Sequence, residues 1–94
     1  MYERVVRFSD VSAGRVEQLV TRIKEANGPP PGVPTTGIKL LFDERQGTAI
    51  AIQEFATAED MAEGAKAFAA MDPSETPGTR VSVDECERKL ELKA

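Results

Sequence analysis

Two polar side chains of this sequence lie within apolar stretches and could contact a ligand: Arg7, in YERVVRF, and Gln53, in TAIAIQEF. An arginine beside an apolar cavity could bind a carboxylate or a phenolate through its N–H donors. A glutamine could orient a ligand carbonyl group. Both residues also have ordinary structural explanations. Arg7 could form an ion pair with a neighbouring acid, and Gln53 could bond to the backbone or to a partner subunit.

Groups suited to acid–base, nucleophilic or metal chemistry are scarce. The chain has no histidine, and its single cysteine, Cys86, has no histidine or second cysteine to activate it. It contains no zinc pattern, no P-loop, no dinucleotide-binding motif and no calcium loop. We therefore expect no metal site and no cofactor. If the protein is an enzyme, a carboxylate or Tyr2 would have to act as the general base.

The N-terminal third predicts a strand followed by a helix. Residues 2–8 have the apolar content of a strand, and Ser9-Asp10 or Ser12 can cap the helix that follows. Asn27-Gly28 is a good helix stop, because both residue types tolerate left-handed dihedral angles. The PPPGVP segment that follows excludes a helix and predicts an extended connection.

Residues 37–55 predict a β-hairpin that is apolar on both faces. Its turn falls at residues 44–47, where Gly47 can adopt positive φ, and a four-residue turn pairs Leu41 with Ile50. Apolar residues occur at both parities of these strands, so helices on one side of a sheet would leave an apolar patch on the other side. Monomeric proteins rarely expose such a patch.

The C-terminal half predicts a second helix and a last strand. Thr57 is a suitable N-cap, with acidic residues in the turn that follows, and the helix should extend to about Met71. The DPSETPGT segment then ends it. Residues 80–92 predict the last strand, and the weaker alternation after Val83 indicates a bulge.

The order β-α-β-β-α-β predicts an α+β fold of the ferredoxin-like type, in which both helices cover one face of a four-stranded antiparallel sheet. We expect residues 1–94 to form a single domain, since a chain of this length supports one core. A second copy of the sheet, related by a two-fold axis, is the simplest cover for the other apolar face. The expected partner is therefore the protein itself, as a homodimer.

The charge of the chain excludes several partners. The net charge is −4 and the isoelectric point about 4.8, so nucleic acid and anionic membranes are poor partners. An RNA-recognition domain of the same topology would need aromatic residues and basic charge on its open sheet face. No segment is apolar and long enough for a signal peptide or a membrane helix, and we expect a cytoplasmic protein.

The run from Gly37 to Asp60, G-x-x-L-L-F-D-x-x-x-G-T-A-I-A-I-x-x-F-x-T-x-E-D, resembles the dimeric α+β barrel superfamily, in particular the small proteins grouped with antibiotic-biosynthesis monooxygenases. The resemblance implies a ligand cavity between sheet and helices, with Phe55 facing it. It places Arg7 and Phe55 where the haem-degrading branch has an asparagine and a tryptophan. The absence of histidine argues against histidine-dependent haem degradation.

Two sets of candidate residues follow from the strand patterns and this resemblance. The expected pocket residues are Arg7, Leu40, Phe42, Ala51, Gln53, Phe55 and Phe68. The expected dimer-interface residues are Val6, Phe8, Leu41, Ile50 and Ile52. Phe55 and Phe68 also have an ordinary explanation as core residues.

Three functions are compatible with this fold. The first is a homodimer that binds a small, mostly apolar or aromatic molecule between sheet and helices. The second, which the resemblance implies, is a cofactor-free monooxygenase acting on an aromatic polyphenol, with Arg7 stabilising the substrate anion. The third is a structural or interaction dimer without catalysis. Because one fold supports many activities, the sequence does not decide whether the protein is an enzyme.

Overall fold

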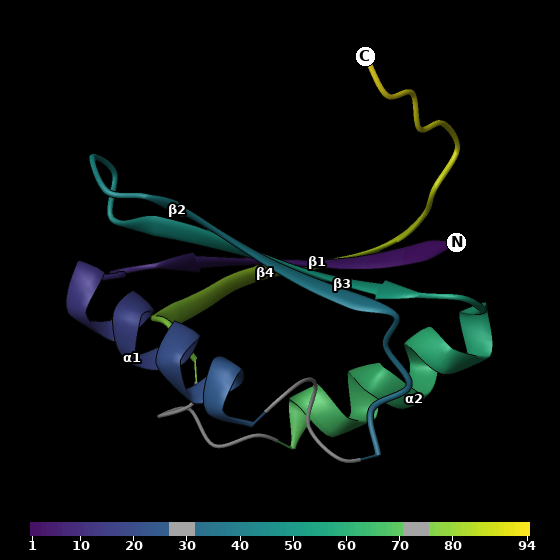
Figure 1. The fold of residues 1–94 in the computed structure, drawn as a ribbon, viewed down its shortest axis with the longest axis horizontal. Helices are drawn as coiled ribbons and strands as arrows, with labels where there is room; N and C mark the ends of the chain where they lie inside the picture. Colours follow the sequence, from purple (N-terminus) through teal and green to yellow (C-terminus); the bar gives the residue numbers. More distant parts are fainter. Residues whose placement is uncertain (27–31, 71–75) are drawn as a thin grey trace.

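The computed structural model describes residues 1–26, 32–70 and 76–94 (Figure 1). Its elements follow the predicted order: β1 (Tyr2–Ser9), α1 (Ala13–Glu25), β2 (Gly37–Asp43), β3 (Thr48–Phe55), α2 (Ala58–Ala69) and β4 (Thr79–Glu87). The strands form one antiparallel sheet in the order β2-β3-β1-β4. Both helices lie on the same side of this sheet (Figure 1). The predicted ferredoxin-like fold is therefore confirmed, and we call the side without helices the open face.

The helix starts are set by local capping. The side chain of Ser12 accepts a hydrogen bond from the Arg15 backbone N–H at 3.3 Å, and that of Thr57 accepts one from Asp60 at 3.0 Å. These bonds satisfy N–H groups that the first helical turn leaves unpaired. The helices end at Glu25 and Ala69. The predicted stop at Asn27-Gly28, the predicted end at Met71, the prolines at 29–31 and the start of DPSETPGT lie outside the described residues.

The hairpin has the predicted register. Asp43 pairs with Thr48 and Leu41 with Ile50, so the turn occupies residues 44–47. Gly47 has φ 64°, in the left-handed region that side chains with a Cβ disfavour.

The positive φ of Gly47 gives a first testable prediction. Gly47→Ala should lower the free energy of unfolding by about 1–2 kcal/mol, because alanine is strained in the left-handed region. Gly14→Ala is the control, because nothing lies within 4 Å of its added Cβ and its φ is negative. Urea denaturation of both variants checks this, and equal midpoints would contradict the assigned turn.

The side chains of β1 point to the opposite sides of the sheet from those predicted. Val6 and Phe8 are 2% and 6% exposed on the helix side, whereas Arg7 is exposed on the open face. The pairing of β1 with β3 explains this. Val6 pairs with Ala51, and Ala51 lies with Gln53 on the helix side of the sheet. The prediction that Val6 and Phe8 belong to a dimer interface and that Arg7 faces the pocket was therefore wrong.

The last strand is shorter than predicted and has its bulge elsewhere. It ends at Glu87, which pairs with Tyr2, the first residue of β1. One further backbone hydrogen bond follows, from the Arg88 N–H to the Met1 carbonyl at 2.9 Å. The register shifts between Arg7, opposite Ser82, and Phe8, opposite Arg80. Val81 is thus the extra residue, two positions before Val83, and the predicted bulge after Val83 was wrong.

The tail that follows β4 lies on the open-face side of the sheet (Figure 1). Arg88 anchors its start, with its guanidinium 3.3 Å from the Glu3 carboxylate and 3.7 Å from that of Glu54. Further along, Leu90 and Leu92 are 75% and 83% exposed. Among the described residues, no helix is long and apolar enough to cross a bilayer.

Candidate functional site

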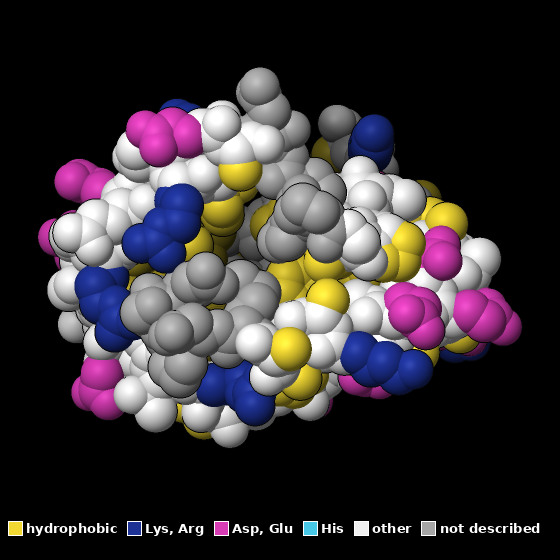
Figure 2. Space-filling model, turned by 90° about the horizontal axis from the view of Figure 1, so that it is seen from below, with side chains coloured by type: hydrophobic (Ala, Val, Ile, Leu, Met, Phe, Trp, Pro, Cys, Tyr) yellow, Lys and Arg dark blue, Asp and Glu magenta, His cyan; other side chains and the backbone are white. Residues whose placement is uncertain are grey.

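A cavity of about 130 Å³ lies between the sheet and the two helices. Seen from the helix side, hydrophobic side chains line the hollow between the helices (Figure 2). The described lining residues come from the four strands, from both helices and from the segment before β4: Arg4, Val6, Phe8, Leu19, Ile23, Ile38, Lys39, Leu40, Ala51, Gln53, Phe68, Thr76, Pro77 and Arg80.

The cavity exists because the two helices pack differently on the sheet. Helix α2 lies close to the sheet, since Gly64 has no side chain at the point where the ring of Phe55 packs against the helix. Helix α1 contributes no buried residue, and its Leu19 and Ile23 line the cavity instead of filling it. On the sheet floor Ala51 leaves room that a larger side chain would occupy.

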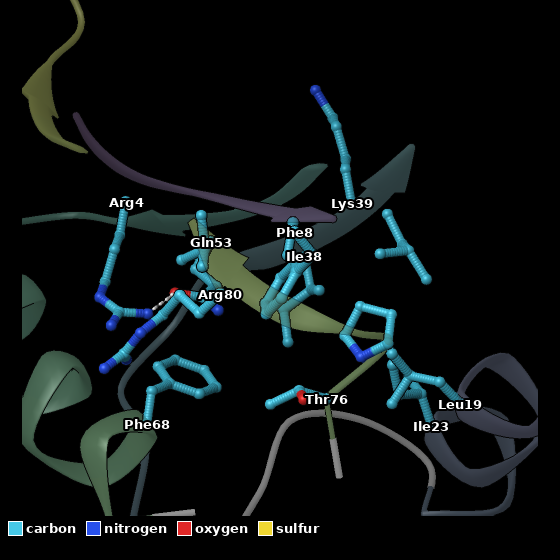
Figure 3. Close-up of a pocket in the computed structure, with 14 residues that line it drawn as sticks. Arg4, Phe8, Leu19, Ile23, Ile38, Lys39, Gln53, Phe68, Thr76 and Arg80 are labelled. Atoms are coloured by element: carbon cyan, nitrogen blue, oxygen red, sulfur yellow. Dashed lines mark hydrogen bonds between the residues drawn. The ribbon is translucent and has the colours of Figure 1, made fainter. Parts of the chain in front are cut away.

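Arg4 is the buried polar residue that the sequence reasoning missed. Its side chain lies beside the cavity, and the residue is only 4% exposed (Figure 3). Nη1 donates a hydrogen bond of 3.0 Å to Oε1 of Gln53, which is 7% exposed. The guanidinium carbon lies 5.4 Å from the centre of the Phe68 ring, within cation–π distance. Nε is buried and has no hydrogen-bond partner.

The electrostatic surroundings of Arg4 are unfavourable to its charge. Burial lowers the pKa of its guanidinium, and the positive charge of Arg80 lowers it further, while Glu85 opposes both effects. Arginine nevertheless stays protonated in proteins. Among the described residues, no carboxylate forms an ion pair with Arg4 or with Arg80.

Lys39 contributes little charge to the cavity. Its side chain extends away from the interior in the close-up (Figure 3), and Nζ lies 3.3 Å from the Glu54 carboxylate. The described lining contains no carboxylate, tyrosine or cysteine. The arrangement can therefore bind and orient a ligand through N–H donors, but its described side chains supply no general base.

The structure brings together four of the seven expected pocket residues: Leu40, Ala51, Gln53 and Phe68 line the cavity. The other three, Arg7, Phe42 and Phe55, do not line it. Phe42 packs against the cluster around Phe8, and Phe55 is fully buried. The expectation that Phe55 faces the cavity was therefore wrong, because the Phe55 ring packs against α2 at Gly64.

The expected interface residues divide between the two faces of the sheet. Val6 and Phe8 line the cavity. The other three lie on the open face: Leu41, Ile50 and Ile52. Side chains alternate along a strand, so these three point away from the side on which Leu40, Ala51 and Gln53 lie. A signal for Arg4 was present in the sequence: it has the parity of Val6 and Phe8, so burying those two also turns Arg4 inward.

Comparison with known proteins supports the fold. No protein-family model and no curated protein matches this chain. Its fold is similar over 100% of both chains to a crystal structure of a mutant of MhuD with two manganese protoporphyrin IX molecules bound per active site, at 17% identity and a TM-score of 0.62. At this identity the likeness establishes the fold alone, and it agrees with the ferredoxin-like α+β fold predicted from the sequence.

Proposed function

We propose that residues 1–94 form a single domain and that two copies of the chain form a homodimer. Each subunit binds a small, mostly apolar or aromatic molecule between its sheet and helices. One observation carries this proposal: an apolar cavity of about 130 Å³ has a buried Arg4–Gln53 pair in its wall. Buried polar groups in an otherwise apolar pocket typically orient a ligand. The porphyrin bound by the MhuD mutant agrees with ligand binding by this fold.

The proposal is tested with a neutral, single-ring probe, 4-fluorotoluene, followed by ¹⁹F NMR. The wild-type protein should broaden and shift its signal in a saturable way. Ala51→Leu should weaken binding at least tenfold, because the added carbons fill the cavity from the sheet floor. Ala62→Leu is the matched control, since Ala62 is exposed on α2.

Circular dichroism should show that both leucine variants stay folded. An unchanged probe signal with the wild-type protein would contradict a ligand cavity and favour a structural or interaction dimer. Equal binding by the two variants would place the probe elsewhere on the molecule.

A second candidate function is a cofactor-free monooxygenase acting on an aromatic polyphenol. The observation that favours it is the buried charge of Arg4, which would lower the pKa of a bound phenol. In such a reaction an anthrone-type CH₂ group and O₂ give C=O and water, and the substrate supplies the electrons. Because the described lining offers no base, solvent would take the phenol proton.

Oxygen uptake tests this second candidate with anthrone, whose enol tautomer is a phenol and can form the required anion. We expect wild-type uptake to exceed that of Arg4→Met at least tenfold, because the methionine variant cannot stabilise the substrate anion. Arg7→Met should behave as the wild type, since Arg7 lies on the open face. No uptake across a panel of such phenols would contradict catalysis and leave ligand binding as the function.

A further inference from the structure

We propose that the ligand of this cavity is an aromatic carboxylate whose anionic group is bound between Arg4 and Arg80. The inference rests on the proposed ligand-binding function and names the chemical class of the ligand. It is carried by the unused donors of Arg4, by the second arginine beside it and by the size of the apolar space.

Arg4 has more donors than partners. A guanidinium carries five N–H groups. Among the described residues, Arg4 makes one hydrogen bond, from Nη1 to Gln53 at 3.0 Å, and its buried Nε makes none. Because this Nε is buried, bulk water cannot serve as its hydrogen-bond partner. A buried cation without an ion pair is the arrangement expected where a ligand supplies the negative charge.

Arg80 adds a second positive charge at the same place. Its guanidinium points toward that of Arg4 in the close-up (Figure 3), and its positive charge lowers the Arg4 pKa. Glu85, opposite Arg4 in β4, is the carboxylate that counters this repulsion, yet it forms no ion pair with either arginine. An anion bound here would be attracted by two guanidinium groups.

Gln53 supports the same assignment. Its Oε1 accepts the Arg4 hydrogen bond, which leaves its NH₂ group turned to other partners, and this group makes no hydrogen bond to a described residue. An anion is an acceptor and satisfies guanidinium and amide donors together. A ligand cation would be repelled by the two guanidinium groups.

The space beside these donors suits one aromatic ring. Cavities of about 150 Å³ lined by apolar side chains bind benzene, and this one measures about 130 Å³. The ring of Phe68 and the side chains of Ile23 and Ile38 line it. A benzoate-sized molecule would pair its carboxylate with the arginines and bury its ring among these residues.

The test compares 4-fluorobenzoate with 4-fluorobenzamide by ¹⁹F NMR, because the two share their shape and differ in charge. We expect the wild-type protein to bind the benzoate at least tenfold more tightly. Arg4→Met should remove this preference while leaving 4-fluorotoluene bound, and Arg80→Gln should weaken benzoate binding about threefold to tenfold. Arg45→Met is the matched control, since Arg45 is exposed in the hairpin turn.

Each outcome separates the inference from the function on which it rests. If 4-fluorotoluene binds but the benzoate binds no better than the benzamide, the carboxylate assignment is overturned and the cavity function stands. Equal benzoate affinity in wild-type, Arg4→Met and Arg80→Gln proteins also overturns it. If none of the three probes binds, both proposals fall. Because Arg80 is exposed, Arg80→Gln should fold. Its benzoate affinity therefore tests the carboxylate assignment even if Arg4→Met does not fold.

Discussion

Phe55→Ala should lower the free energy of unfolding by about 3–5 kcal/mol, close to half the stability of a domain of this size. Phe55 is 0% exposed, the most deeply buried large side chain among the described residues. Its ring packs with Val33 and Met61 and lies directly beneath Gly64 of α2. Truncation would leave a cavity at the contact that holds α2 on the sheet.

A double-mutant cycle between Phe55 and Gly64 tests the contact between them directly. A Cβ at position 64 would lie 2.6 Å from Cζ of Phe55, so Gly64→Ala alone should destabilise by about 1–3 kcal/mol in spite of better helix propensity. In the double variant the new methyl group enters the space that the ring vacates. The combined loss should therefore fall short of the sum by at least about 1 kcal/mol.

Urea denaturation at one fixed protomer concentration measures all four proteins, because subunit association would otherwise shift the midpoints. Gly14→Ala serves as the helical control, since its added Cβ meets nothing within 4 Å. Additive losses, or a loss below about 1 kcal/mol for Phe55→Ala, would contradict the role of this contact.

Ile50→Lys should convert the proposed homodimer to a monomer. Ile50 lies on the open face between Leu41 of β2 and Arg7 of β1. Leu41 is 50% exposed and Val81 is 64% exposed, so apolar surface on this side of the sheet is uncovered in the single chain. A lysine here would place a second cation beside Arg7 and require its desolvation on association. We expect the dimer dissociation constant to rise at least a hundredfold, about 2.7 kcal/mol.

Analytical ultracentrifugation distinguishes the two states. The wild-type protein should sediment with twice the 10.2 kDa chain mass and Ile50→Lys with the single mass. Ala62→Lys carries the same charge change on the exposed side of α2 and should remain dimeric. A monomeric wild-type protein would refute the proposed dimer, and a dimeric Ile50→Lys protein would move its interface away from β3.

The sequence by itself determined the element order, the start of α2 and the hairpin, and it narrowed the cap of α1 to Ser9-Asp10 or Ser12. These features depend on neighbours a few residues apart: Ser12 and Thr57 cap the helices that follow them, and Gly47 permits the turn. A tight turn also aligns the strands on either side of it, so the pairing of Leu41 with Ile50 followed from the turn length. The same local logic correctly placed Leu40, Ala51 and Gln53 on one side of the hairpin.

Only the tertiary structure decided which side of β1 faces the helices and where β4 ends. YERVVRF has apolar residues at both parities, so its pattern did not specify a buried side. Pairing with β3 on one side and β4 on the other settled it, turning Val6 and Phe8 inward together with Arg4 and leaving Arg7 outside. The candidate site therefore kept its hairpin residues but changed its arginine, because a strand's facing depends on partners distant in the sequence.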